Sequence, residues 1–159
     1  MNLYIEGVQD MQKYFINGFL LLLPILVWNV IFASQLTQKG FQNDHLVPAW
    51  LLYAEHGLRV IVFLFPLLLA FETKAPYFKL GIILYVVGTI LYLLTWIPLI
   101  WFADSAWSQS PWVILGPFAT PLIWCLGIAF IGNSLLYGIG SILFVAVHVA
   151  HGLLSFELL

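Results

Sequence analysis

The sequence has very little charge, and this shortage excludes most soluble proteins. Only 8% of its 159 residues are charged, whereas 63% are hydrophobic and 17% aromatic. A soluble domain carries about 25% charged residues, so this chain has too little polar surface to cover a water-facing globule. We therefore expect a multi-pass protein of the cell membrane, with the lipid bilayer as its main partner.

Cysteine and basic residues are also scarce, which narrows the possible sites. Cys125 is the single cysteine, so an internal disulfide and a zinc site with two thiolates from this chain are excluded. Five basic residues leave no patch for phosphates, and nucleic acid is not an expected partner. No Walker loop, dinucleotide fingerprint or catalytic zinc or serine motif occurs. The sequence therefore names no reaction and no cofactor.

Long hydrophobic runs dominate what is present. A helix needs about 20 apolar residues to cross a ~30 Å hydrocarbon core. This rule predicts one all-α transmembrane domain over residues 1–159, with spanning helices at 14–34, 48–71, 76–102, 111–131 and 134–156. The last two helices come from one run, divided at the turn-forming pair Gly132-Asn133. No signal-peptide pattern precedes the first run, so we expect it to be a retained spanning helix.

The few lysines predict an orientation. With five crossings, Lys13, Lys74 and Lys79 lie on one side of the membrane and Lys39 lies alone on the other. Cytoplasmic loops carry the excess of basic residues. We therefore expect the N-terminus in the cytoplasm and the C-terminus outside.

Ionisable side chains within the apolar runs are the strongest functional signal. The second helix carries Glu55, His56 and Arg59, and the fifth carries His148 and His151. Helical rise places Glu55 ~10 Å and His148 ~9 Å below the same outer face. Such groups usually face a bundle interior or a watery cavity. Glu55 and Arg59 also have the spacing and order of a helical ion pair, which either neutralises the two charges or holds a polar ligand.

Tryptophans fall in the same outer layer, and a proline kink lies there between Trp96 and Trp101. Aromatic walls with a few convergent polar groups suit an amphiphilic ligand, and proline kinks in four of the five helices can open a space between them. The kink positions are Pro24, Pro66, Pro98, Pro117 and Pro121. The predicted ligand-binding residues are Trp28, Glu55, His56, Arg59, Trp96, Trp101 and His148.

Four functions fit this pattern, and the first is the leading hypothesis. It is a protein that binds an amphiphilic or lipid-like molecule, or a cofactor, in this outer-half pocket. The second is an enzyme acting on a lipid or isoprenoid, with Glu55, His56 or His148 as acid or base. The third is a haem or metal redox protein with His56, His148 and His151 as candidate ligands.

The fourth function is a non-catalytic assembly subunit. Small residues recur on one face of the fifth predicted helix, which allows another helix to approach closely. This stripe packs either on the fourth helix or on a partner protein. Its residues are Ser134, Gly138, Ala146 and Ala150.

Overall fold

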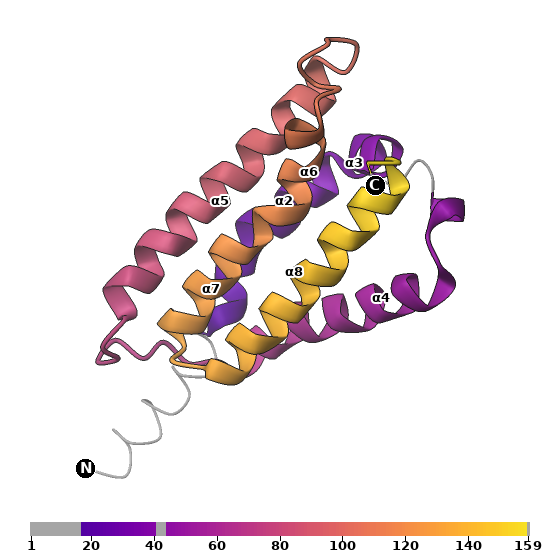
Figure 1. Ribbon diagram of the computed structural model, residues 1–159. Helices are drawn as coiled ribbons and strands as arrows, with labels where there is room; N and C mark the ends of the chain where they lie inside the picture. The colour runs from indigo at the N-terminus through magenta and orange to yellow at the C-terminus, as the bar shows by residue number, and fades with distance from the viewer. Residues whose placement is uncertain (1–16, 41–43, 159) are drawn as a thin grey trace, which may run out of the picture.

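The computed structural model describes residues 17–40 and 44–158, and this part of the chain is helical, without strands (Figure 1). Lys13, on which the predicted orientation partly depends, lies outside the described residues. The α-helices are α2 (Leu23–Ile31), α3 (Ala33–Gly40), α4 (Ala49–Leu64), α5 (Phe78–Trp101), α6 (Pro111–Ala119), α7 (Pro121–Ile131) and α8 (Leu135–Ser155). Three short 3-10 helices join them: η1 (Gly18–Leu22), η2 (Asp44–Leu46) and η3 (Phe65–Leu68).

Four helical segments are long and apolar enough to cross a membrane, namely Ala49–Leu68, Phe78–Trp101, Pro111–Ile131 and Leu135–Ser155. They correspond to the second to fifth predicted helices. The predicted division at Gly132-Asn133 is confirmed, because α7 ends at Ile131 and Asn133 takes the left-handed conformation of a turn (φ 46°). The fold is therefore that of an integral, multi-pass helical membrane protein.

The first predicted helix, residues 14–34, is shorter in the structure. η1 and α2 form one apolar helical segment, Gly18–Ile31, and Phe32 is the C-cap of α2. Asn17 caps this segment, because its Oδ1 accepts a hydrogen bond of 3.0 Å from the backbone of Phe19. At 1.5 Å per residue the segment is roughly 21 Å long, less than a ~30 Å hydrocarbon core. A fifth crossing therefore stays a prediction.

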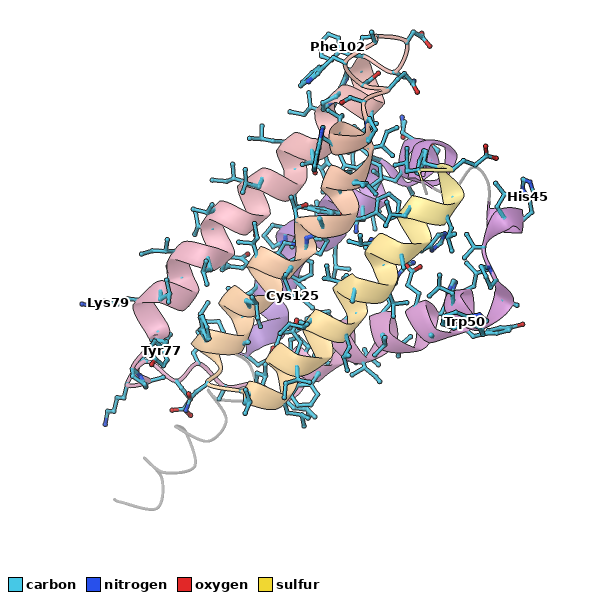
Figure 2. The ribbon with its side chains drawn as sticks, in the orientation of Figure 1. His45, Trp50, Tyr77, Lys79, Phe102 and Cys125 are labelled. Carbon is cyan, nitrogen blue, oxygen red and sulfur yellow. The ribbon has the colours of Figure 1, made fainter. Side chains whose placement is uncertain are left out.

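The long helices run alternately up and down, which gives the bundle two distinct ends. At the Asn17 end, the Gly18 amide donates to the Leu69 carbonyl (2.7 Å) and the Glu72 amide donates to the Ile131 carbonyl (3.0 Å). The opposite, Ser155 end holds α3, the 102–110 loop and the end of α8. Figure 2 shows Lys79 at the first end and Phe102 at the second. The described chain thus begins and finishes at opposite ends of the bundle.

Exposed tryptophans gather at the Ser155 end. They begin α4 and α6, end α5 and lie in the loop before α6: Trp50, Trp112, Trp101 and Trp107. Trp112 is the most exposed of them, at 87%. Because tryptophan favours the boundary between hydrocarbon and water, this ring of side chains is typical of a membrane interface.

Glycines allow α5 and α7 to lie in close contact. A Cβ atom on Gly88 would come within 2.4 Å of the Trp124 backbone nitrogen, and one on Gly127 within 2.4 Å of the Tyr85 nitrogen. Helices in lipid associate largely through such tight van der Waals packing. This glycine-lined contact is the most extensive between any two helices of the described chain.

The small-residue stripe predicted on the fifth helix, α8, is divided between two environments. A Cβ on Gly138 would lie 3.6 Å from the Cβ of Ala129 in α7. Ser134 caps α8, its hydroxyl accepting a hydrogen bond of 3.2 Å from the Tyr137 amide. Ala146, however, is exposed. Only the first half of the stripe therefore packs on α7, and binding of a partner helix stays a prediction.

We expect Gly127→Ala to destabilise the fold by about 1–3 kcal/mol, the usual range for overpacking. The added methyl group would meet backbone atoms of Tyr85, which cannot rotate away as the end of a side chain can. Gly140→Ala in α8 is the matched control, because a Cβ there meets nothing within 4 Å. Unfolding in mixed detergent micelles, followed by circular dichroism, measures both variants. Equal stability of the two would contradict the close α5–α7 contact.

Candidate functional site

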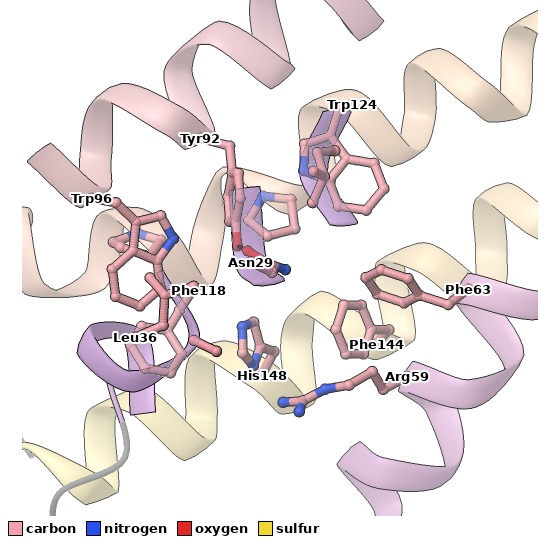
Figure 3. A pocket seen from close by; sticks show the side chains of 14 residues that line it. Asn29, Leu36, Arg59, Phe63, Tyr92, Trp96, Phe118, Trp124, Phe144 and His148 are labelled. Carbon is pink, nitrogen blue, oxygen red and sulfur yellow. Dashed lines mark hydrogen bonds between the residues drawn. The ribbon is translucent and has the colours of Figure 1, made fainter. Parts of the chain in front are cut away.

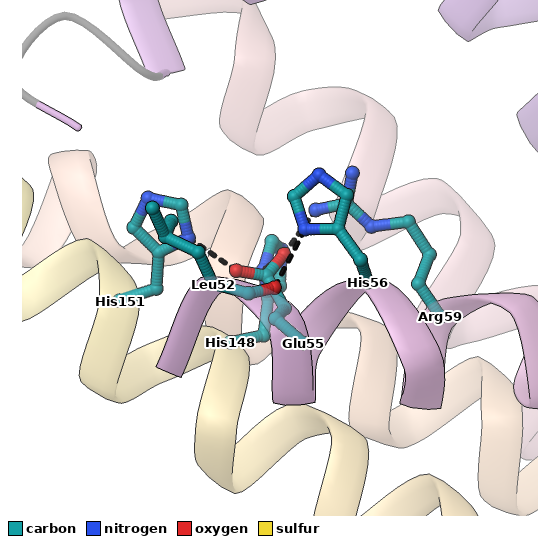
Figure 4. Close-up of polar contacts among 6 residues, drawn as sticks. All are labelled: Leu52, Glu55, His56, Arg59, His148 and His151. Carbon is teal, nitrogen blue, oxygen red and sulfur yellow. Dashed lines mark hydrogen bonds and ion pairs between the residues drawn. The ribbon is translucent and has the colours of Figure 1, made fainter. Parts of the chain in front are cut away.

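The carboxylate of Glu55 is the centre of the polar contacts inside the bundle. Its side chain is 0% exposed, although α4 carries many lipid-facing residues. Arg59 and His148 donate to Oε1, the latter from Nδ1 at 3.0 Å, and the Nδ1 of His151 donates to Oε2 (Figure 4). Both oxygens of the ionised carboxylate are therefore satisfied without water. We call Glu55, Arg59, His148 and His151 the Glu55 cluster.

Helical periodicity builds this cluster from two short stretches of sequence. Glu55 and Arg59 are four residues apart on α4, and His148 and His151 are three apart on α8, so each pair shares one side of its helix. The residues of α4 that are buried, Leu51, Glu55 and Val62, also recur at helical spacing. Glu55 thus occupies a position on the inward, otherwise apolar side of α4, where α8 packs against it.

Contact with the carboxylate fixes the histidine tautomers. A ring nitrogen that faces an ionised carboxylate must carry a proton, so both histidines are protonated on Nδ1. The other nitrogen of His148, Nε2, faces away from Glu55 and toward a cavity (Figure 3). Phe144 stacks on this imidazole, with ring centroids 5.2 Å apart and an interplanar angle of 14°, and Phe118 lies against it at 4.7 Å. His148 is therefore held in a defined orientation at the cavity wall.

The cavity has a volume of about 250 Å³ and lies between the helices of the bundle. Each of the α-helices named above contributes two residues to its lining. These residues are Ile25, Asn29, Ala33, Leu36, Arg59, Phe63, Tyr92, Trp96, Pro117, Phe118, Pro121, Trp124, Phe144 and His148. The walls are thus largely aromatic or aliphatic, and Arg59 and His148 join the cavity to the Glu55 cluster.

Four of the predicted site residues come together in the structure. Arg59 and His148 both contact Glu55, and Trp96 lines the adjoining cavity. His151, predicted only as a possible metal ligand, belongs to the same cluster. Glu55 of α4 therefore lies beside His148 and His151 of α8, and their depth in the membrane stays a prediction.

His56, Trp28 and Trp101 lie elsewhere. His56 follows Glu55 by one residue, or about 100° around the helix, and is exposed, its Nδ1 donating to the Leu52 carbonyl at 2.7 Å. Trp28 and Trp101 pack with Phe32, at centroid distances of 4.4 and 5.3 Å, outside the cavity lining. Trp101 is also 53% exposed at the end of α5. None of these three side chains is placed to bind a ligand in the cavity.

Several of the lining residues were not predicted from the sequence. Tyr92 donates to the Oδ1 of Asn29 at 2.9 Å, which joins α5 to α2. Tyr92 is four residues before Trp96, and Pro121 is three before Trp124, so each pair shares one side of a helix. This spacing was the available signal, but it does not show which side of α5 or α7 faces the cavity.

The three histidines considered as metal ligands do not converge. His148 and His151 both direct Nδ1 at Glu55, whereas His56 is exposed on another side of α4. Within residues 17–40 and 44–158, no group of three or more His, Cys, Asp and Glu is placed to hold a metal ion.

Comparison of the chain with protein-family models, curated proteins and solved structures finds no match. The fold defines a class, the multi-pass helical membrane proteins.

We expect Glu55→Gln to destabilise the protein by about 3 kcal/mol, as is typical when one partner of a buried charged network is removed. The amide keeps the shape of the side chain but offers only one acceptor oxygen to three donors. His56→Gln is the control, and its effect should stay within about 0.5 kcal/mol, because an exposed side chain is replaced. Chemical unfolding in detergent compares the two variants. Similar values would show that the cluster contributes little to the fold.

Proposed function

We propose that this protein binds an amphiphilic small molecule in the cavity between its helices. The apolar part of the ligand lies against the aromatic walls, and its polar end lies near Arg59 and His148. One observation carries the proposal: a cavity of about 250 Å³ lined mainly by apolar side chains has Arg59 and His148 at one wall. Ligand sites in proteins commonly combine apolar walls with a few fixed polar groups.

The size of the cavity limits what it can hold. Its 250 Å³ lies just below the range of about 300–1,000 Å³ for sites that take drug-sized ligands. A small molecule fills it, or one end of a longer chain enters it. The fixed imidazole of His148 and the Tyr92–Asn29 hydrogen bond keep the polar groups in place before a ligand binds, which lowers the cost of ordering them.

Acid–base catalysis is the second candidate function, and the Glu55–His148 contact favours it. Because Glu55 holds the Nδ1 proton of His148, the Nε2 lone pair faces the cavity, as a general base requires. The two functions differ in the fate of the ligand. A binding protein releases it unchanged, whereas an enzyme releases a product that mass spectrometry can identify.

We also propose that the chain crosses the cell membrane five times. The Asn17 end then lies in the cytoplasm and the cavity lies in the outer half of the membrane. Lys74 and Lys79 at the Asn17 end support this orientation, because cytoplasmic loops carry the excess of basic residues. The exposed tryptophans then lie at the outer interface. In this arrangement the short Gly18–Ile31 segment is the first crossing.

Cysteine labelling in intact cells tests the orientation. In a Cys125→Ala background, we expect Asp104→Cys to react with an impermeant maleimide from outside. Lys74→Cys should react only after the membrane is opened, because the two positions lie at opposite ends of the bundle. The reverse pattern would place the cavity in the inner half of the membrane.

Filling the cavity tests the binding function. We expect Ala33→Phe to weaken binding of dodecanoate or dodecanol by at least about tenfold, since a loss of 1.4 kcal/mol corresponds to a factor of ten. Both alanines are exposed, but Ala33 lines the cavity and Ala146 does not, so Ala146→Phe is the matched control. Native mass spectrometry of the purified protein titrated with each amphiphile measures binding. If neither amphiphile forms a saturable one-to-one complex with the unmodified protein, the proposal fails.

A further inference from the structure

We infer that the polar end of the ligand is a carboxylate, so that the cavity recognises a monoanionic amphiphile such as a fatty acid. The inference rests on the proposed binding function and specifies the chemistry of its ligand. It follows from the hydrogen-bonding groups and charges at the cavity wall.

The polar atoms at the cavity wall are mostly hydrogen-bond donors. Arg59 has N–H groups only and cannot accept. The Oδ1 of Asn29 already accepts from Tyr92, and Figure 3 shows its amide nitrogen directed toward the cavity. Among the lining side chains, the remaining acceptors are the hydroxyl oxygen of Tyr92 and the Nε2 of His148. A ligand that offers acceptor oxygens therefore fits this wall better than one that offers donors.

Two tryptophans strengthen this conclusion. Trp96 and Trp124 line the cavity and are 6% and 1% exposed. The indole nitrogen of each is buried and has no hydrogen-bond partner in the described part of the chain. A buried donor without an acceptor is unfavourable, and native proteins rarely leave one without a structural or functional reason. Carboxylate oxygens, with about four lone-pair sites, are good acceptors for such a donor.

The charges favour a single negative charge on the ligand. Glu55 is 0% exposed, whereas the Arg59 side chain is 37% exposed and lines the cavity, so the ligand meets the cation and not the carboxylate. The charges of Glu55 and Arg59 balance each other. A bound monoanion is balanced when His148 takes up one proton from water, and Nε2 then becomes another donor. A dianion would need a second proton in the same buried cluster, and a cation would be repelled by Arg59.

Three probes with the same chain separate these possibilities: dodecanoate, dodecanol and dodecylamine. The protein is reconstituted in nanodiscs of zwitterionic phosphatidylcholine, and binding is measured by native mass spectrometry. We expect Arg59→Gln to weaken dodecanoate binding by at least about tenfold and to affect dodecanol far less. Partition of each probe into the bilayer is the same for variant and parent. The ratio of their affinities for a probe therefore reflects binding at the site alone. Lys79→Gln, which removes an exposed cation at the Asn17 end, should change neither affinity.

Trp124→Phe provides a test that does not disturb the Glu55 cluster. This change keeps an aromatic ring but removes the buried N–H group. We expect dodecanoate binding to fall several-fold, with dodecanol affected less. The second variant matters because Arg59→Gln also removes a contact to Glu55 and could reduce the yield of folded protein.

The outcomes distinguish this inference from the proposed function. Binding of dodecanol that equals or exceeds that of dodecanoate, with no selective loss in Arg59→Gln or Trp124→Phe, overturns the carboxylate assignment and leaves the binding function standing. Absence of binding by all three probes overturns both. If butyrate binds as tightly as dodecanoate, carboxylate recognition is supported and the ligand is a small acid in solution, not a lipid.

Discussion

Burial of one carboxylate determines how the two halves of this bundle meet. Glu55 lies on the inward side of α4, where an unpaired charge would be strongly unfavourable. Arg59 supplies one donor from the same helix, but the other two come from His148 and His151 on α8. Within the described chain few residues of α4 are buried, whereas α5 and α7 are joined by close glycine contacts. The hydrogen bonds of the Glu55 cluster are thus the specific contacts that set the register of α4 against α8.

The same cluster also orients the wall of the cavity. His148 belongs to both: Nδ1 contacts Glu55, and Nε2 faces the space bordered by Phe144 and Phe118. Any ligand that contacts Nε2 therefore senses the protonation and position of Glu55 through a single imidazole ring. In the proposed binding function, His148 therefore contributes both to the contact between two helices and to the ligand site, and a simple substitution would change both.

Much of the fold was predictable, because hydrophobic length and helical spacing are local properties. The four long segments and the Gly132-Asn133 turn follow from the sequence, and depth along a helix was enough to match Glu55 with His148. Rotation about the helix axis was not predictable, and it directs His56 outward. The same limit applies to Trp28, Tyr92 and Trp124, whose neighbours come from distant segments. The length of the first segment is set by the Asn17 cap at its start and by the end of α2 at Ile31, and neither position was predictable from hydrophobic length.

The shortness of the Gly18–Ile31 segment has a consequence for the surrounding lipid. Bilayers adapt to a helix shorter than their hydrocarbon core by becoming locally thinner, or by admitting polar flanking groups. In a five-crossing arrangement this deformation falls beside α2 and α3, and both helices line the cavity through Ile25, Asn29, Ala33 and Leu36. Headgroups and water would then lie nearest to the binding space on that side of the molecule. In the proposed arrangement, the mismatch would give a molecule dissolved in one leaflet a lateral approach to the cavity.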